Sequence, residues 1–194
     1  MSYHIYTTDG IILKRATFGE ADILLYVLTR DLGLVIASAR SARLAVSKLR
    51  PALQEYAHVS ISVIHGKSGW KITNVVEKNN FYFDVPEQNK KVLARIASVL
   101  LREIAGESPH PEIFQTTVSG FQFLKSVTEK NISNFETLAV LRILSGLGYV
   151  VSDTDTEIFL KEPNIWSLEL LEKISAKKLA LVGIINKALK ESQL

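Results

Sequence analysis

The period of the hydrophobic pattern changes near residue 81, and this change constrains the fold more than any other feature. Before it, "ADILLYVLTR" and "LVIASAR" flank the turn "DLG", while "HVSISVIH" and "WKITNVVEK" flank "GKSG". Val59, Ile61 and Val63 alternate with serines, which is the period of a half-buried strand. Together with "YTTDGIILKR", these runs predict about five short strands joined mostly by tight turns.

About five antiparallel strands with one longer connection between the third and fourth are typical of a small closed barrel such as the OB-fold. The pattern alone leaves an SH3-like barrel or a small sandwich open. We therefore expect a β + α protein. An OB-fold nucleic-acid-binding domain of about five strands over residues 1–80 would precede an all-α helical domain over residues 81–194.

The second part of the chain has helical periodicity. The expected helices cover the stripe from Val92 to Ile104, residues 112–130, "SNFETLAVLRILSGLGY", and one or two helices in residues 166–191. The third begins with Ser133 or Asn134 as its N-cap and ends at Gly146 and Gly148. The segment "DTDTEIFLKEPN" is interpreted as a polar connection.

Motifs of known enzymes are missing from the sequence. There is no P-loop, no G-x-S-x-G and no H-E-x-x-H, and the four histidines are scattered. "DTDTEI" imitates the start of an EF-hand loop, but Asn164 stands where that loop needs a glutamate. We expect no enzyme, no catalytic residue, no metal site and no cofactor.

The composition also bears on the compartment. The chain has no cysteine, which excludes disulfides and thiolate zinc sites and fits a reducing cytosol. No apolar run approaches the ~18 residues of a membrane span, and the start lacks the pattern of a signal peptide. We expect a cytoplasmic protein without membrane contact.

Positive charge is concentrated in the first part of the chain. Residues 1–80 hold ten Lys and Arg against six Asp and Glu, whereas residues 81–194 hold thirteen against fourteen. An acid-free run from Leu32 to Gln54 carries four cations. A basic surface of this kind attracts polyanions, so we expect the segment to hold phosphates.

OB barrels bind single strands through a charged groove and exposed aromatic rings on which bases stack. The predicted DNA-binding residues are Lys14, Arg15, Phe18, Arg40, Arg43, Lys48, Arg50, Lys67 and Lys71. Tyr26 is interpreted as a core residue and Trp70 as a packing residue, because both lie in apolar strand patterns. Gly10, Gly19, Glu20 and Asp22 are interpreted as turn-shaping and barrel-closing residues rather than site residues.

Several motifs are similar to those of the RecO family of bacterial recombination mediators. "TDGIILKR" and "FGEAD" resemble its opening strand and turn, and Arg40 to Arg43, "SKL" and Leu53-Gln54 resemble its basic stretch. "NFE…LRILSGLGY" resembles its later helix. Two departures stand out: the chain lacks the four-cysteine zinc site of many members, and Ser41, Leu44, Ala45 and Val46 thin the basic stretch.

The resemblance implies a recombination mediator that binds single- and double-stranded DNA and anneals complementary strands. It also implies help in loading recombinase onto strands coated by single-strand-binding protein. The implied partners are the RecR mediator and the acidic C-terminal tail of the coating protein. For that tail we expect an apolar pocket beside Lys125, Lys130 and Arg142.

Two other classes of protein remain open. An adaptor that works through protein contacts would bind nucleic acid weakly, and its binding would depend little on salt. An RNA-binding OB-fold protein would prefer RNA to DNA of the same sequence, because only RNA offers the 2′-hydroxyl.

Overall fold

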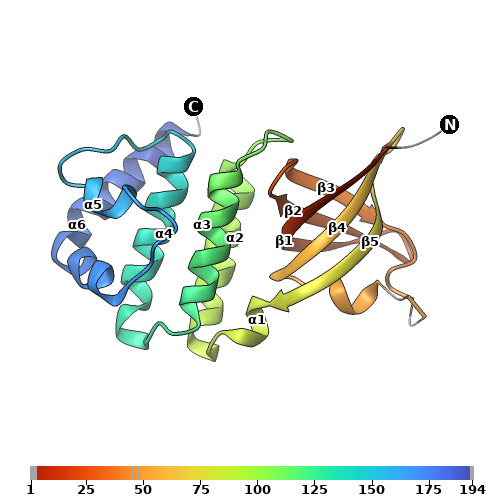
Figure 1. Cartoon of the computed structure of the whole chain (residues 1–194), viewed down its shortest axis with the longest axis horizontal. Helices are drawn as coiled ribbons and strands as arrows, with labels where there is room; N and C mark the ends of the chain where they lie inside the picture. The colour runs from red at the N-terminus through yellow and green to blue at the C-terminus, as the bar shows by residue number, and fades with distance from the viewer. Residues whose placement is uncertain (1–3, 45, 48, 193–194) are drawn as a thin grey trace. The chain divides into compact units, whose positions relative to one another are not determined.

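The computed structural model describes residues 4–44, 46–47 and 49–192 (Figure 1). Its contacts divide the chain into two compact units. The barrel unit comprises Met1–Asp84 with Ala105–Phe114, and the helical unit comprises Val85–Ile104 with Gln115–Leu194. The expected domain boundary between residues 80 and 81 stays a prediction.

Five strands close into a barrel in the order β1-β2-β3-β5-β4. They are β1 Ile5–Phe18, β2 Asp22–Thr29, β3 Gly33–Ala39, β4 Ala57–Gly66 and β5 Gly69–Asn80. All pairs are antiparallel except β3 with β5, which is parallel. A closed barrel followed by helices confirms the fold class expected from the change of period.

The core of the barrel follows from the alternation along the strands. Leu25, Val27, Val59 and Ile61 point inward and are fully buried. Gly10 lies where β1 crosses this core, and a Cβ there would lie 2.6 Å from a methyl group of Val27. The strand can therefore approach its neighbour this closely only without a side chain at that position.

A segment between two helices is fastened to the barrel. The backbone N–H of Leu34 donates to the carbonyl of Gly106 at 3.1 Å, and Trp70 Nε1 donates to Glu107 Oε1 at 2.7 Å. Gly33 has a positive φ of 73°, and a Cβ there would overlap the backbone of Ser108. These contacts explain why Ala105–Phe114 belong to the barrel unit.

The helices follow the expected order. They are α1 Phe81–Asp84, α2 Lys90–Glu103, α3 Pro111–Leu124, α4 Ile132–Gly146, α5 Glu157–Leu160 and α6 Leu168–Glu191. Short 3-10 helices cover Arg50–Ala52, Glu87–Asn89 and Glu129–Asn131. Helix α4 is the most buried of them, with ten of its residues in the interior.

Three details of the helical half differ from the sequence-based prediction. Helix α4 begins at Ile132 with Asn131 at the N-cap, so the expected caps Ser133 and Asn134 lie inside its first turn. Asn134 instead donates to the carbonyl of Leu171 at 3.0 Å, a tertiary contact that local pattern does not reveal. The second expected helix ends early, at Leu124, and the expected polar connection contains α5 with Phe159 buried.

Two kinds of feature are absent from the residues that the structure describes. None of their helices combines the length and the apolar character needed to cross a bilayer. No group of three or more His, Asp or Glu side chains among them is arranged to hold a metal ion.

Candidate nucleic-acid interface

The outer face of β1, β2 and β3 carries a cross-strand row of exposed and half-buried side chains. Lys14 pairs with Tyr26, and Tyr26 pairs with Ile36. The Lys14 ammonium lies 5.6 Å from the centre of the Tyr26 ring, within the range of a cation–π contact. Tyr26 therefore lies half-buried on the outer face rather than in the core, which corrects its interpretation from sequence.

A neighbouring groove of about 430 Å³ runs along the same face. Its lining residues come from all five strands and from the ends of their connections, and they include Phe18, Leu24, Arg40, Trp70 and Lys71. Three of the nine predicted DNA-binding residues thus meet here: Phe18, Arg40 and Lys71. Phe18 is 54% exposed, so its ring is available to an incoming planar group.

Turn geometry brings Phe18 and Arg40 to the groove. Gly19 takes a φ of 60° directly after β1, and Asp22 Oδ1 accepts from the backbone N–H of Ser41 at 2.7 Å. The N–H of Arg43 donates to the carbonyl of Ala21 at 2.9 Å. The turn after β1 and the segment after β3 are thereby tied together, in agreement with the turn-shaping role expected for Gly19 and Asp22.

The remaining predicted cations lie in several places. The Arg43 guanidinium is exposed but donates to the carbonyls of Gly19 and Glu20, at 3.4 and 2.9 Å. Arg50 is exposed on a 3-10 helix and Lys67 is exposed in the turn between β4 and β5. Lys48 lies outside the described residues, and Arg15 lines a different cavity.

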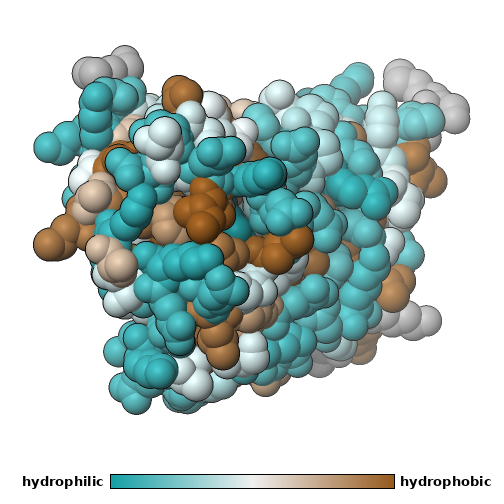
Figure 2. Space-filling model, turned by 60° about the vertical axis from the view of Figure 1, so that its left-hand side comes forward, coloured by the Kyte–Doolittle hydropathy of each residue, from teal (hydrophilic) through white to brown (hydrophobic). Residues whose placement is uncertain are grey.

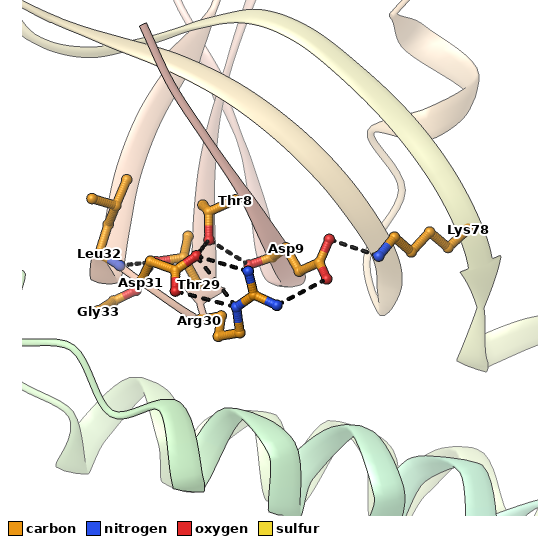
Figure 3. Close-up of polar contacts among 8 residues, drawn as sticks. All are labelled: Thr8, Asp9, Thr29, Arg30, Asp31, Leu32, Gly33 and Lys78. Atoms are coloured by element: carbon orange, nitrogen blue, oxygen red, sulfur yellow. Dashed lines mark hydrogen bonds and ion pairs between the residues drawn. The ribbon is translucent and has the colours of Figure 1, made fainter. Parts of the chain in front are cut away.

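Two other cations of the barrel are occupied by carboxylates (Figure 3). Lys78 Nζ lies 2.6 Å from Asp9 Oδ1, and Arg30 contacts both Asp9 and Asp31. The Thr8 hydroxyl donates to Asp31 at 2.6 Å, and this bond, together with Arg30, lowers the pKa of that carboxyl. Asp9 of the opening motif therefore pairs with Arg30 and Lys78, and Thr8 and Asp9 together link β1 to the turn after β2 and to the end of β5.

The helical unit places the three expected tail-binding residues differently. Lys125 and Lys130 are exposed, near the end of α3 and before α4. Arg142 is only 3% exposed, donates to the carbonyls of Phe159 and Glu162, and lies 4.4 Å from the Trp166 ring. Burial lowers the pKa of Arg142 to about 10. Its surroundings are those of an internal brace rather than of an accessible carboxylate receptor.

Trp70 combines packing with exposure to the groove. It is 8% exposed, belongs to the core cluster of the barrel and also lines the groove, so its interpretation as a packing residue is confirmed. The sequence signal that could have identified Tyr26 is its register: it lies between inward-facing Leu25 and Val27.

The closed barrel with an aromatic and cationic outer groove, followed by helices, defines an OB-fold protein with a helical second unit. Residues 1–78 match the family model described as "Recombination protein O N terminal". This match confirms the resemblance to the RecO family over these residues.

A curated relative agrees with the family model. The chain is 28% identical over 151 residues to a protein named DNA repair protein RecO from Thermodesulfovibrio yellowstonii. The match covers 75% of this chain and 58% of that relative, so the chain spans less than two thirds of the length of the protein it matches.

Proposed function

We propose that the chain is a non-enzymatic DNA-binding mediator of recombinational DNA repair that holds single strands on the outer face of its barrel. The observation that carries the proposal is the groove that brings Phe18, Arg40 and Lys71 together. An exposed ring and two cations along one groove suit the bases and phosphates of a single strand, and stacking contributes about 1–3 kcal/mol per base.

Further activities follow from the similarity to the RecO family. We include in the proposal the binding of double-stranded DNA, the annealing of complementary strands and the loading of recombinase on coated strands. Annealing needs no catalytic residue, because a positive surface lowers the repulsion between two phosphate backbones. The proposed partners are RecR and the acidic tail of single-strand-binding protein, and the proposed compartment is the cytoplasm.

Fluorescence anisotropy of labelled single-stranded DNA tests the groove. A triple variant with Phe18→Ala, Arg40→Ala and Lys71→Ala should bind at least about tenfold more weakly than the native chain at low salt. The matched control changes one exposed ring and two exposed cations of the helical unit, Tyr149→Ala, Lys161→Ala and Lys190→Ala. Equal affinity of the triple variant and the control would place the DNA surface elsewhere.

A second candidate, a protein-interaction adaptor, is favoured by the surface of the helical unit. Figure 2 shows hydrophobic side chains scattered among hydrophilic ones on its forward face. Val151, Ile165 and Leu179 are among the exposed apolar residues of this unit. Absence of DNA binding at low salt by the native chain would favour the adaptor over the mediator.

A further inference from the structure

A second cavity of the barrel unit, of about 440 Å³, lies apart from the outer groove. The cavity is here named the aromatic pocket. It is lined by the rings of Tyr56, Tyr82 and Phe83 and by the polar residues Arg15, Gln54, Glu55 and Asn80. They come from β1, the connection before β4, the end of β5 and α1, so only the fold brings them together.

The rings of the pocket offer flat apolar faces. Tyr56 and Tyr82 are nearly parallel, with an interplanar angle of 17° and centres 6.1 Å apart. Phe83 stands at 87° to Tyr82 and is 74% exposed. Large exposed rings at a concave site are typical of surfaces that stack on a planar partner.

The backbone holds Tyr56 in a conformation that side chains other than glycine rarely adopt. Its φ is 65°, in the left-handed region. The N–H of Tyr56 donates to the carbonyl of Ile12 at 2.7 Å, and its carbonyl accepts from Phe81 at 3.1 Å. These bonds fix the ring at the pocket despite the strain, a pattern that clusters at binding sites.

Asn80 supplies a buried donor without a partner. The residue is 5% exposed, and its Oδ1 accepts from the backbone N–H of Tyr82 at 3.0 Å. Its Nδ2 has no hydrogen-bond partner among the residues that the structure describes. An unsatisfied buried amide is unfavourable, so a ligand that brings an acceptor to it is stabilised.

Arg15 gives the pocket a group that can bind an anion. Glu55 Oε1 already accepts from the backbone N–H of Arg15 at 2.9 Å, and the Arg15 guanidinium itself lines the cavity. The Arg15 Nη1 lies 3.5 Å from Gln54 Oε1, which leaves its charge without a carboxylate partner among the described ion pairs. A planar ring that carries acceptors and is joined to an anion would use both the Arg15 guanidinium and the free Asn80 donor.

The pocket is continuous along the chain with the outer face. Lys14 and Arg15 are neighbours on β1; Lys14 lies beside Tyr26 on the outer face, whereas Arg15 lines the aromatic pocket. A strand whose phosphates contact first Lys14 and then Arg15 would run from the outer face to the aromatic pocket, and its attached base could enter the pocket. A single strand, whose bases are free to turn outward, meets this requirement.

We propose that the aromatic pocket takes one unstacked nucleobase of a single strand whose backbone crosses the outer face of the barrel. This inference rests on the proposed function, since it requires single-strand binding. It adds a site for one base, with Arg15 near the phosphate, the rings of Tyr82 and Phe83 against the base, and Asn80 as a hydrogen-bond donor.

Photocross-linking of the full chain provides the test. Oligothymidylates that carry 4-thiothymidine at one position each are bound, irradiated and digested, and the cross-linked residues are identified by mass spectrometry. We expect one position to react with Tyr56, Tyr82 or Phe83. In parallel, Tyr82→Ala with Phe83→Ala, and Phe83→Ala alone, should each lower the affinity for the unmodified oligonucleotide about fivefold or more.

An abasic site at the reactive position should weaken binding to the native chain but not to the Tyr82 and Phe83 variant, because the variant has already lost that base contact. Tyr149→Ala, of similar exposure at 38% against 39% for Tyr82, is the control and should behave like the native chain. Binding with cross-links only at Phe18 or Tyr26, and no loss in the pocket variants, would overturn the pocket and leave the proposed function standing. No binding by the native chain would overturn both.

Discussion

At the scale of single residues, two glycines differ in the space around them. One lies in the opening motif of the barrel, and the other lies in the last helix. Gly10 has a methyl group of Val27 within 2.6 Å of the place where a Cβ would stand, whereas Gly183 in α6 has nothing within 4 Å. Packing against Val27 requires a glycine at position 10. Nothing requires one at position 183, where glycine only weakens the helix.

Gly10→Ala should therefore lower the free energy of unfolding by about 1–3 kcal/mol, because the core must shift to admit the methyl group. Gly183→Ala should raise it by about 0.5–1 kcal/mol, because alanine favours the helix. Urea denaturation followed by circular dichroism measures both. A neutral Gly10→Ala would show that the barrel tolerates the methyl group without strain.

His58 makes the stability of the barrel depend on pH. Burial lowers the pKa of His58, and Lys78 acts in the same direction. Below about pH 6.5 the unfolded chain takes up a proton that the folded chain resists, so the free energy of unfolding falls as the pH decreases through this range.

His58→Phe keeps a ring against Phe81, which stacks on His58 with centres 6.2 Å apart, and removes the titrating group. The gain in stability of the variant over the native chain should grow from pH 8 to pH 5 in urea titrations. A difference that stays constant across this range would contradict the assignment to His58.

At the scale of elements, the strands were predictable because period and turn residues are local signals. β2, β3, β4 and β5 lie where the two hairpins were expected. The start of α4 and the short helix α5 were not predictable, because Asn134 binds the carbonyl of Leu171 and Phe159 is buried by tertiary packing. Three residues of the outer groove, Phe18, Arg40 and Lys71, were predicted from the sequence. The aromatic pocket was not predicted, because its residues, from Arg15 to Phe83, are distant in the sequence and form no local motif.

The attachment of residues 105–114 to β3 and β5 should depend on the hydrogen bond between Glu107 and Trp70. Glu107→Ala removes the acceptor of the nearly buried Trp70 Nε1, which should lower the free energy of unfolding by about 1–3 kcal/mol. It should also speed amide hydrogen exchange at Leu34, whose N–H donates to Gly106. Glu112→Ala, at an exposed position of α3, is the control. Unchanged exchange at Leu34 would mean that the backbone contact persists without Glu107.

At the scale of the whole molecule, charge is divided unevenly along the chain and then partly neutralised by folding. Residues 1–80 hold the excess of cations, yet Arg30 and Lys78 are paired with carboxylates. The salt dependence of binding should report which cations meet phosphates, since each such contact with a single strand contributes about 0.7 to the slope of log K against log salt.

Arg40→Ala and Lys71→Ala should each reduce the magnitude of this slope by about 0.7, measured by anisotropy from about 50 to 200 mM salt. Arg30→Ala removes the same charge from a residue held by Asp9 and Asp31, and should leave the slope unchanged. An equal decrease of the slope in all three variants would indicate that the overall positive charge of the barrel attracts DNA, rather than contacts of particular cations with phosphates.

Residues 105–114 belong to the barrel unit although helix α2 of the helical unit precedes them, and this limits how recombination between genes can exchange the two units. The chain passes between its two units three times, after Asp84, after Ile104 and after Phe114. A gene cut at any one of these points leaves at least one unit without part of its sequence; a fragment ending at Asp84 lacks Gly106 and Glu107. A single junction after Phe114 transfers the whole barrel unit, but only together with Val85–Ile104, which belong to the helical unit. Exchange of the barrel alone is therefore disfavoured, and both units are more readily inherited together.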